Sequence, residues 1–377
     1  MNFISLGMVK EKEEEELFYN IALTRTGQIG GRLARHLLQY FENAREIFHV
    51  PVKRLEAVEG IGLKKIQALR QTIDEAMIRK EISFIRTHAI RPLFITDPGY
   101  PSRLRLCPDA PVMLYYKGNQ DLNQSRVISI VGTRKNTDYG AQLTESLIEG
   151  LAGQDILIVS GLAFGIDIIA HRKALRCGIP TVGVMAHGMD RIYPQQHKHI
   201  AKEMAARGGL LTEYPSGTLP DKYNFPMRNR IVAGMCDLTV VVETEVRGGA
   251  MITAKLALGY NREVAAFPGR VSDKKSDGCN YLIRTQAAQL ITGAADLLDM
   301  MNWQPPEEKH AVQQRLFGVL SPEESRVVDI LAQSGEMHID AIGPKTGIHA
   351  THLSALLLGL ELHGHIRSLP GKRYRLG

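Results

Sequence analysis

Between residues 127 and 267, short apolar runs alternate with segments whose apolar residues recur at helical spacing. The runs are nearly uninterrupted and rich in Val, Ile and Leu, as in parallel strands that are buried on both faces. They are Val127–Val131, Ile156–Ser160, Thr181–Met185, Gly209–Thr212, Leu238–Val242 and Val264–Phe267. The helical segments between them are Ala141–Leu151, Asp167–Arg176, Gln195–Ala206, Met227–Met235 and Met251–Gly259. This alternation predicts an α/β fold with an extended Rossmann-like, doubly wound parallel sheet.

The residues before this alternation have two other patterns. Residues 17–85 have the apolar spacing of helices, interrupted by Gly-containing turns. The turn Val58–Lys65 resembles a helix-hairpin-helix motif, whose glycines let the backbone approach a DNA phosphate; such hairpins also serve purely as packing units. Residues 91–118 are rich in proline and aromatic residues, and we interpret them as an extension added to the edge of the sheet.

The C-terminal residues predict a winged helix. Ser321 and Pro322 have the sequence of a helix N-cap and first position. Three helical segments follow, and after them a short hairpin; these are Glu323–Gln333, Ile339–Lys345, Ala350–His363 and Ile366–Leu376. The predicted organisation is a helical (helix-hairpin-helix/SAM-like) domain, an extended Rossmann-like domain, a linker and a winged-helix domain, at residues 1–85, 86–302, 303–320 and 321–377.

Composition narrows the class of protein. No apolar run approaches the roughly 20 residues that span a bilayer, and the N-terminus lacks a signal-peptide pattern, so we expect a cytoplasmic protein without a membrane partner. The four cysteines form no Cys-x-x-Cys pair, which predicts reduced thiols rather than a zinc site or a disulfide framework. Net charge is +6, and five of these charges fall within residues 86–302, where a polyanion would therefore bind.

Small and basic residues follow the first predicted strand of the sheet. The turn after Val131 contains Gly132, Arg134 and Lys135. It lacks the Gly-x-Gly-x-x-Gly spacing of a dinucleotide site, so no nucleotide cofactor is predicted. Arg134 is suited to clamp a phosphate with two hydrogen bonds, although an arginine here could equally pair with a surface carboxylate.

Residues 222–230 are the densest polar and aromatic cluster in the chain. Arg228 and Arg230 are two residues apart on a predicted helix and point in different directions, so one could reach a ligand while the other holds a loop. Phe225 beside Lys222 offers a platform for a base next to a charge for the backbone, the combination that single-stranded nucleic acid needs. Phe225 could also be a core residue that packs at the helix start.

A glycine pair, Gly248 and Gly249, opens the predicted helix that holds Lys255 and repeats the phosphate-loop pattern at another strand end. No acidic, histidine or nucleophilic residues fall at a spacing diagnostic of a triad or a metal site, so no catalytic residue and no metal are predicted. Asp167 and His171 share a helix face and are expected to be a structural pair.

Several motifs, in this order, carry a family resemblance. They are Gly132-Thr133-Arg134 with Tyr139-Gly140, Ser160 to Asp167 with His171 and Ala174-Leu175, Asp190 with Tyr193-Pro194, Phe225 to Arg230, Ile252-Thr253-Ala254, and Pro268-Gly269. Over roughly residues 90–300 the chain resembles the DNA-processing proteins of the DprA family, also called Smf. The helical front domain and the winged-helix tail resemble accessory domains found in many members.

The resemblance implies a non-enzymatic function: binding and protecting single-stranded DNA during natural transformation, and loading the recombinase RecA for DNA recombination. It also implies a homodimer formed through the Rossmann-like domain. The DNA-binding residues predicted from motif and resemblance together are Arg134, Lys135, Lys222, Phe225, Arg228, Asn229, Arg230 and Lys255. The predicted phosphate-loop glycines are Gly132, Gly161, Gly165, Gly248 and Gly249.

Three departures from the family pattern accompany the resemblance. Thr133 stands where Ser is common, residues 248–251 replace Ser-Gly-Ser-Leu, and Gln286 replaces a glycine. An alternative function is a nucleotide-binding or nucleotide-cleaving Rossmann-like enzyme, similar to the phosphoribohydrolases; their catalytic glutamate would stand at position 256, which is Leu256 here. A transcription factor acting through the winged helix is a third alternative, which the zero net charge of residues 303–377 disfavours.

Overall fold

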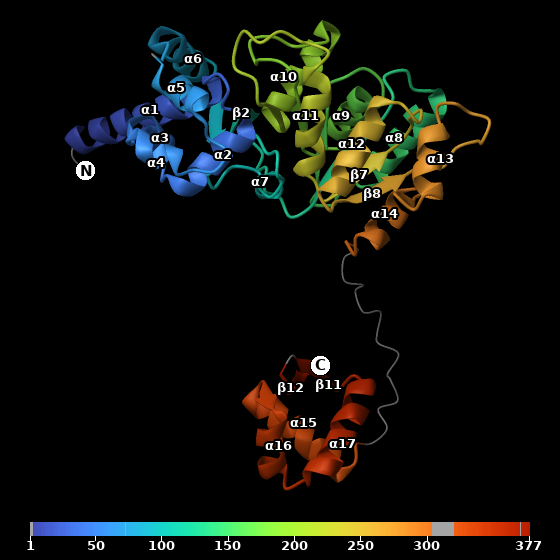
Figure 1. Ribbon diagram of the computed structural model, residues 1–377. Coiled ribbons are helices and arrows are strands. Elements are labelled where there is room, and N and C mark those ends of the chain that lie inside the picture. Colours follow the sequence, from blue (N-terminus) through green and yellow to red (C-terminus); the bar gives the residue numbers. More distant parts are fainter. Residues whose placement is uncertain (1–2, 72, 304–319, 370) are drawn as a thin grey trace. The chain divides into compact units, whose positions relative to one another are not determined.

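The chain forms two compact units, residues 1–303 and 304–377. The computed structural model describes residues 3–71, 73–303, 320–369 and 371–377 (Figure 1). The predicted linker 303–320 therefore lies outside the described residues, except for residues 303 and 320. Residue 370, within the predicted hairpin Ile366–Leu376, also lies outside them. Each unit is considered by itself below.

The first unit begins with a group of helices. They are α1 (Phe3–Arg25), α2 (Gly31–Tyr40), α3 (Ala44–His49), α4 (Val52–Glu56), α5 (Leu63–Arg70) and α6 (Glu75–Thr87). The turn that resembles a helix-hairpin-helix joins α4 to α5, and Lys65 Nζ donates to the Gly60 carbonyl at 2.7 Å. Apolar side chains of these helices share one core with the edge strands of the sheet, so the helical segment packs directly on the sheet.

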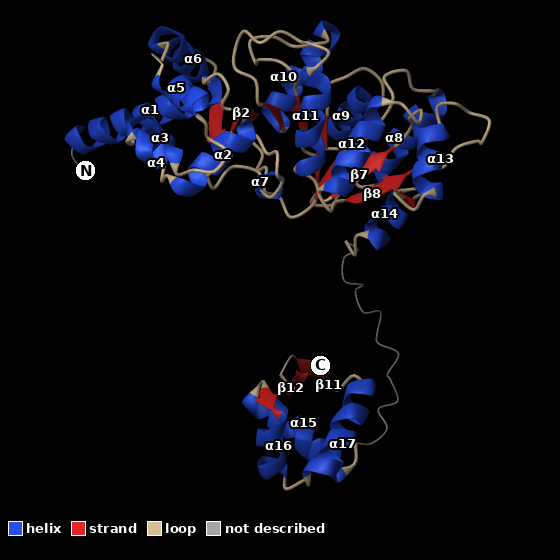
Figure 2. Ribbon diagram, viewed as in Figure 1, coloured by secondary structure: helices blue, strands red, loops and turns tan. Residues whose placement is uncertain are grey.

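A nine-stranded sheet forms the rest of this unit, in the order β1-β2-β6-β5-β4-β3-β7-β8-β9 (Figure 2). Its strands are β1 (Arg91–Phe94), β2 (Met113–Gly118), β3 (Val127–Val131), β4 (Leu157–Ser160), β5 (Thr181–Val184), β6 (Gly209–Thr212), β7 (Leu238–Val241), β8 (Glu263–Ala266) and β9 (Gln289–Leu290). β3 to β9 are parallel, while β1 and β2 pair antiparallel at one edge. The predicted doubly wound sheet with an added edge is confirmed.

Helices cover both faces of the sheet. Apolar side chains of each central strand point alternately to the two faces, so each face has its own core. Val127 and Val131 of β3 belong to the core beneath α11 and α12, whereas Ile128 and Ile130 belong to the core beneath α8, α9 and α14. The helices of this part are α7 (Ser102–Arg105), α8 (Asp138–Gly150), α9 (Ile166–Arg176), α10 (Lys198–Arg207), α11 (Asn224–Gly234), α12 (Gly249–Gly259), α13 (Asp277–Arg284) and α14 (Ala294–Met300). The pattern analysis did not identify α13, α14 or β9, which are short.

The strand order fixes where a ligand can bind. From β3 the chain builds outward through β4, β5 and β6, and then returns to place β7 on the other side of β3. The connections that follow β3 and β7 therefore diverge toward opposite faces, and in open α/β sheets the crevice at such a switch point is the usual binding site. The loops after β3 and β7 are those in which the sequence placed Arg134 and the glycine pair.

The second unit is a winged helix, as predicted. It consists of α15 (Pro322–Ser334), β10 (Met337–His338), α16 (Ile339–Thr346), α17 (Ala350–Leu362), β11 (Ile366–Leu369) and β12 (Arg373–Leu376). The N-cap prediction is also confirmed, because Ser321 and Glu324 form a reciprocal capping box. Leu331, Leu357 and Ile366 lie in its small separate core.

In the part of the chain that the structure describes, no helix is long and apolar enough to cross a membrane. No cluster of His, Cys, Asp and Glu side chains among those same residues could hold a metal ion. The four cysteines are free thiols, and three of them, Cys107, Cys236 and Cys279, are buried.

The contact between β2 and β6 tolerates no side chain at Gly209, because a Cβ there would lie 2.3 Å from the Tyr116 ring. We expect Gly209→Ala to lower the free energy of unfolding by about 1–3 kcal/mol through overpacking. The single tryptophan, Trp303, packs on the second sheet core, so its fluorescence during guanidinium unfolding reports on the first unit. Gly259→Ala, where a Cβ meets no atom within 4 Å, is the control and should not destabilise.

Candidate nucleic-acid interface

A groove of about 1010 Å³ lies at the switch point of the sheet. Its walls come from the loops that follow β3, β4, β5, β6, β7 and β8 and from residues of α11 and α12. The first N–H groups of a helix have no partner within the helix, and α12 begins at Gly249 in this wall. The groove thus combines basic loops with a helix N-terminus, an arrangement that attracts anions.

Glu243 holds the loop after β3 in place. This residue follows β7 and is 1% exposed. Its carboxylate accepts hydrogen bonds from the Thr137 backbone N–H, at 2.9 Å, and from the Thr137 hydroxyl. Its carbonyl accepts from the Thr133 N–H at 2.7 Å. The carboxylate also packs on Gly140, where a Cβ would lie 2.2 Å from it. These contacts fix the two ends of the segment that carries Arg134.

Arg134 lies over an aromatic ring. Its guanidinium carbon is 4.9 Å from the centre of the Phe225 ring, and that ring is 6.0 Å from the ring of Tyr193. Tyr193 is 48% exposed, and Phe225 is half-buried. Phe225 is therefore not a core residue, although it does pack against neighbours near the start of α11. An arginine above a partly open ring provides a charge and a stacking surface at one point.

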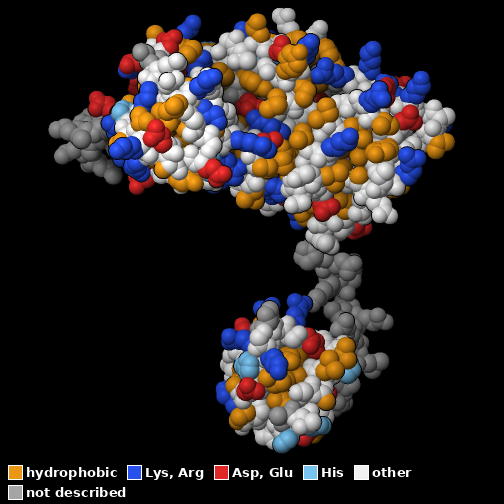
Figure 3. All heavy atoms as spheres, viewed as in Figure 1, with side chains coloured by type: hydrophobic (Ala, Val, Ile, Leu, Met, Phe, Trp, Pro, Cys, Tyr) orange, Lys and Arg blue, Asp and Glu red, His pale blue; other side chains and the backbone are white. Residues whose placement is uncertain are grey.

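Three exposed cations line the groove: Arg134, Lys135 and Lys222. None of them forms an ion pair with a residue that the structure describes. Lys275 also lines the groove, but its ammonium group is 2.6 Å from the Glu245 carboxylate, and this contact lowers the pKa of Glu245. The first three charges are therefore available to a ligand. On the face in Figure 3, other Lys and Arg side chains are dispersed over the surface, so net charge alone does not locate a site.

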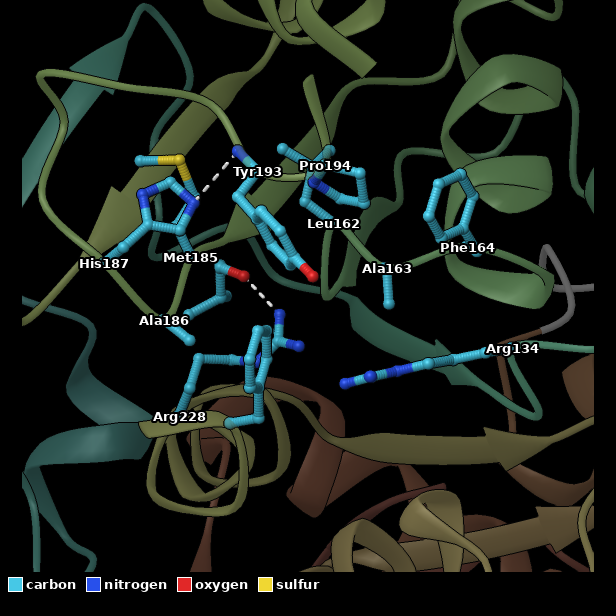
Figure 4. A pocket seen from close by; sticks show the side chains of 12 residues that line it. Arg134, Leu162, Ala163, Phe164, Met185, Ala186, His187, Tyr193, Pro194 and Arg228 are labelled. Atoms are coloured by element: carbon cyan, nitrogen blue, oxygen red, sulfur yellow. Dashed lines mark hydrogen bonds between the residues drawn. The ribbon is translucent and has the colours of Figure 1, made fainter. Parts of the chain in front are cut away.

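Arg228 is a buried cation at the floor of the groove. Its side chain is 4% exposed and donates to the Val184 carbonyl (Figure 4). Burial lowers the pKa of Arg228, and the nearby Asp167 carboxylate opposes this effect. A Cβ on Gly161 would lie within 2.5 Å of both side chains, so the glycine is needed to let them approach. Figure 4 shows Arg134 and Arg228 entering one pocket from different sides.

Most of the predicted site residues come together in this groove. It contains Gly132, Arg134, Lys135, Gly161, Lys222, Phe225, Arg228, Asn229, Gly248 and Gly249. Arg230, Lys255 and Gly165 are not among the residues that line it. Arg230 is buried, pairs with Glu213 and donates to the Asp109 carbonyl at 2.6 Å. Lys255 is exposed on α12.

Gly165 has a packing role. Its φ is +80°, and a Cβ there would lie 2.1 Å from the Thr133 carbonyl oxygen.

His171 does not form the structural pair with Asp167 that the sequence predicted. Its ring nitrogens lie 2.6 Å from the Gly161 carbonyl oxygen and 2.7 Å from the Thr181 hydroxyl, both of which belong to strand ends.

The sequence reasoning assigned no role to Tyr193, Leu219 or Lys275, which also line the groove. Lys275 lies in the loop after β8, so the strand-end rule that selected the other loops could have included it. Tyr193 and Leu219 are in long connections whose course the strand pattern does not determine. At position 256, where the nucleotide-cleaving alternative requires a glutamate, Leu256 packs partly buried against the first core.

Two family models match this chain, one in each of its two compact units. Residues 91–302 match the family model of DNA recombination-mediator protein A, and residues 304–372 match that of the DprA winged helix domain. The chain belongs to the DprA family. Among curated DprA-family proteins, Protein Smf of Synechocystis is 34% identical, over 96% of this chain and 98% of its own. The DNA processing protein DprA of Streptococcus pneumoniae is 40% identical, over 60% of this chain and 78% of its own.

Solved DprA structures are similar in fold. The X-ray structure of DprA from Streptococcus pneumoniae superposes with a TM-score of 0.67 at 34% identity, covering 75% of this chain and 97% of that one. DprA from Helicobacter pylori, whose structure describes a single-stranded DNA binding mode, superposes with a TM-score of 0.52 at 31% identity, covering 57% and 96%. The family predicted from the sequence motifs is thus confirmed.

The buried His171 generates a prediction about pH. Burial lowers the pKa of this imidazole to about 4, although its hydrogen bond to Gly161 opposes the shift. An unfolded histidine titrates near 6.5. The unfolded chain therefore takes up a proton that folded His171 does not, and the free energy of unfolding should fall as pH drops through 6.5 toward 4.

The test compares guanidinium unfolding of the parent and His171→Gln near pH 7 and near pH 5. We expect the parent to lose about 2 kcal/mol more than the variant over this interval. His187 and His197, whose pKa values burial also lowers, are present in both proteins and cancel in the comparison. An identical pH dependence of the two proteins would show that His171 titrates normally.

Proposed function

We propose that this chain binds single-stranded DNA in the groove at the switch point of its sheet. The observation that carries the proposal is the placement of Arg134 over the Phe225 ring, in a groove whose other exposed cations, Lys135 and Lys222, form no ion pair with a described residue. The described single-stranded DNA binding mode of the Helicobacter pylori relative supports it.

Each part of the groove has a role in this proposal. Arg134, Lys135 and Lys222 neutralise backbone phosphates, while Gly249, where a Cβ would meet no atom within 4 Å, leaves room for the strand beside the N-terminus of α12. Phe225 and Tyr193 offer ring faces to bases. A base offers a free face for such stacking only when it is unstacked from its neighbours, which favours a single strand over a duplex.

We further propose that the bound strand is protected and passed to the recombinase RecA during natural transformation. The protein would act as a homodimer through its Rossmann-like domain, residues 86–302, with accessory domains at residues 1–85 and 321–377. Membership of the recombination-mediator family supports this larger role. The groove itself accounts only for binding of the strand.

The phosphate contacts are tested with the double variant Arg134→Ala/Lys222→Ala. Since each lost contact removes about 0.7 from the slope of log K against log salt, we expect the slope for an oligodeoxythymidine strand to become shallower by about 1.4. Fluorescence anisotropy over a salt series gives both affinity and slope. Lys255→Ala removes an exposed lysine outside the groove and should change neither. Parental affinity of the double variant at moderate salt would remove the basis for this groove.

The stacking contact is tested with Phe225→Leu. Loss of one aromatic platform should weaken binding by about 1–3 kcal/mol per stacked base, without changing the salt slope, because no charge is removed. The same anisotropy titration separates the two effects. Tyr40→Leu is the control: Tyr40 is an aromatic residue on α2, 52% exposed, and is not among the residues that line the groove. Equal losses in both variants would argue against stacking on Phe225.

A further inference from the structure

The loop between β6 and α11 carries part of the groove without belonging to a helix or strand. Within this loop, residues 213–223, Leu219, Pro220 and Lys222 line the groove. A free lysine on such a loop contributes to binding only if the backbone beneath it is held. The contacts that hold the backbone are therefore as important as the charge.

One of these contacts comes from the helical segment at the start of the chain. Glu81 of α6 is 2% exposed although its side chain is charged. Its Oε1 and Oε2 accept hydrogen bonds from the Ser216 backbone N–H, at 3.0 and 3.2 Å, and Oε2 also accepts one from the Ser216 hydroxyl. Arg25 Nη2, at the end of α1, lies 3.3 Å from the same carboxylate. Glu81 thus joins two helices to the loop.

A second contact holds the loop from the side of the sheet. The Asp190 carboxylate accepts from the Gly217 N–H at 2.9 Å, and the Gly188 N–H donates to the Thr218 carbonyl at 3.1 Å. Residues 216–218 are therefore held between Glu81 and the segment after β5. Lys222 follows four residues later, just before α11, where the Tyr223 N–H donates to the Asp221 carboxylate at 2.8 Å and the Asn224 side-chain amide donates to the Leu219 carbonyl at 3.4 Å.

We propose that Glu81 is a positioning residue for the DNA groove, which it completes from the helical segment by fixing the loop that carries Lys222. The inference rests on the proposed function of the groove. For the DNA affinity of a variant that loses this contact, the inference predicts a change opposite in direction to the one expected from charge alone. Removing a negative charge from a protein that binds a polyanion should strengthen binding, whereas loss of positioning weakens it.

Two conservative variants of Glu81 separate these effects. Glu81→Gln removes the charge but keeps the length and a carbonyl acceptor for the Ser216 N–H. Glu81→Asp keeps the charge but is one methylene shorter and cannot span the same distance. If Glu81 acts by position, Glu81→Gln binds an oligodeoxythymidine strand like the parent and Glu81→Asp binds it more weakly. If only the charge matters, Glu81→Gln binds more tightly and Glu81→Asp is unchanged, which would overturn the proposal.

The route through Lys222 is tested by combining variants. Glu81→Asp should reduce the salt slope as Lys222→Ala does, and should cause no further loss of affinity in the Lys222→Ala background. Full additivity of the two losses would contradict the inference. Glu75→Gln is the control, because Glu75 lies on the same helix, is 65% exposed and pairs only with Arg79 among the described residues. It should leave affinity unchanged, and unfolding followed by Trp303 fluorescence confirms that each variant is folded.

Hydrogen exchange of the free protein gives a readout that needs no DNA. Glu81→Asp should raise amide exchange across residues 214–223, while Glu81→Gln and Glu75→Gln should not. If the parent does not bind single-stranded DNA, the proposed function fails, yet the exchange result still decides whether Glu81 holds the loop. Unchanged exchange in Glu81→Asp would overturn the inference even if the groove binds DNA.

Discussion

The groove depends on one carboxylate at the switch point of the sheet. Glu243 follows β7, and through both its carboxylate and its carbonyl it fixes the segment after β3, between Thr133 and Thr137. β3 and β7 are neighbours, so the two loops begin side by side, but their connections diverge, and the Glu243 contacts hold the loops together beyond the last strand pair. Gly140 leaves the space that the carboxylate occupies. The position of Arg134 over Phe225 follows from this arrangement.

The predicted DNA-binding cations differ in burial. Arg228 and Arg230 lie three and five residues after Phe225 on the same helix, but both are buried and both are used inside the protein. Arg134 and Lys222 are exposed and form no ion pair with a described residue. A buried guanidinium costs several kcal/mol unless it is hydrogen-bonded. Arg228 and Arg230 each donate to a carbonyl inside the protein, although the Nε of each has no partner among the described residues. The exposed charges that line the groove are those on the loops.

The sequence predicted the fold well because its strands are continuous apolar runs and its helices have regular spacing. The same pattern located the groove, since parallel strands end at one edge, and most of the candidate residues lie there. It could not distinguish roles among glycines: Gly161 and Gly165 allow close packing of the chain, whereas Gly249 has open space around it. Nor could it assign Tyr193 or Leu219, whose positions depend on the course of long loops.

The least predictable contact is that between Glu81 and Ser216, which are 135 residues apart. A glutamate on an amphipathic helix is ordinarily a solvated residue, and only the tertiary fold shows that it is buried against a loop of the sheet domain. The helical segment also shares its apolar core with β1 and β2, so it is packed against the sheet by more than this one contact. Because the surrounding apolar packing fixes the helical segment against the sheet, it also fixes the geometry of the contact between Glu81 and Ser216. The helical segment is therefore part of the structure that shapes the groove, although none of its described residues lines it.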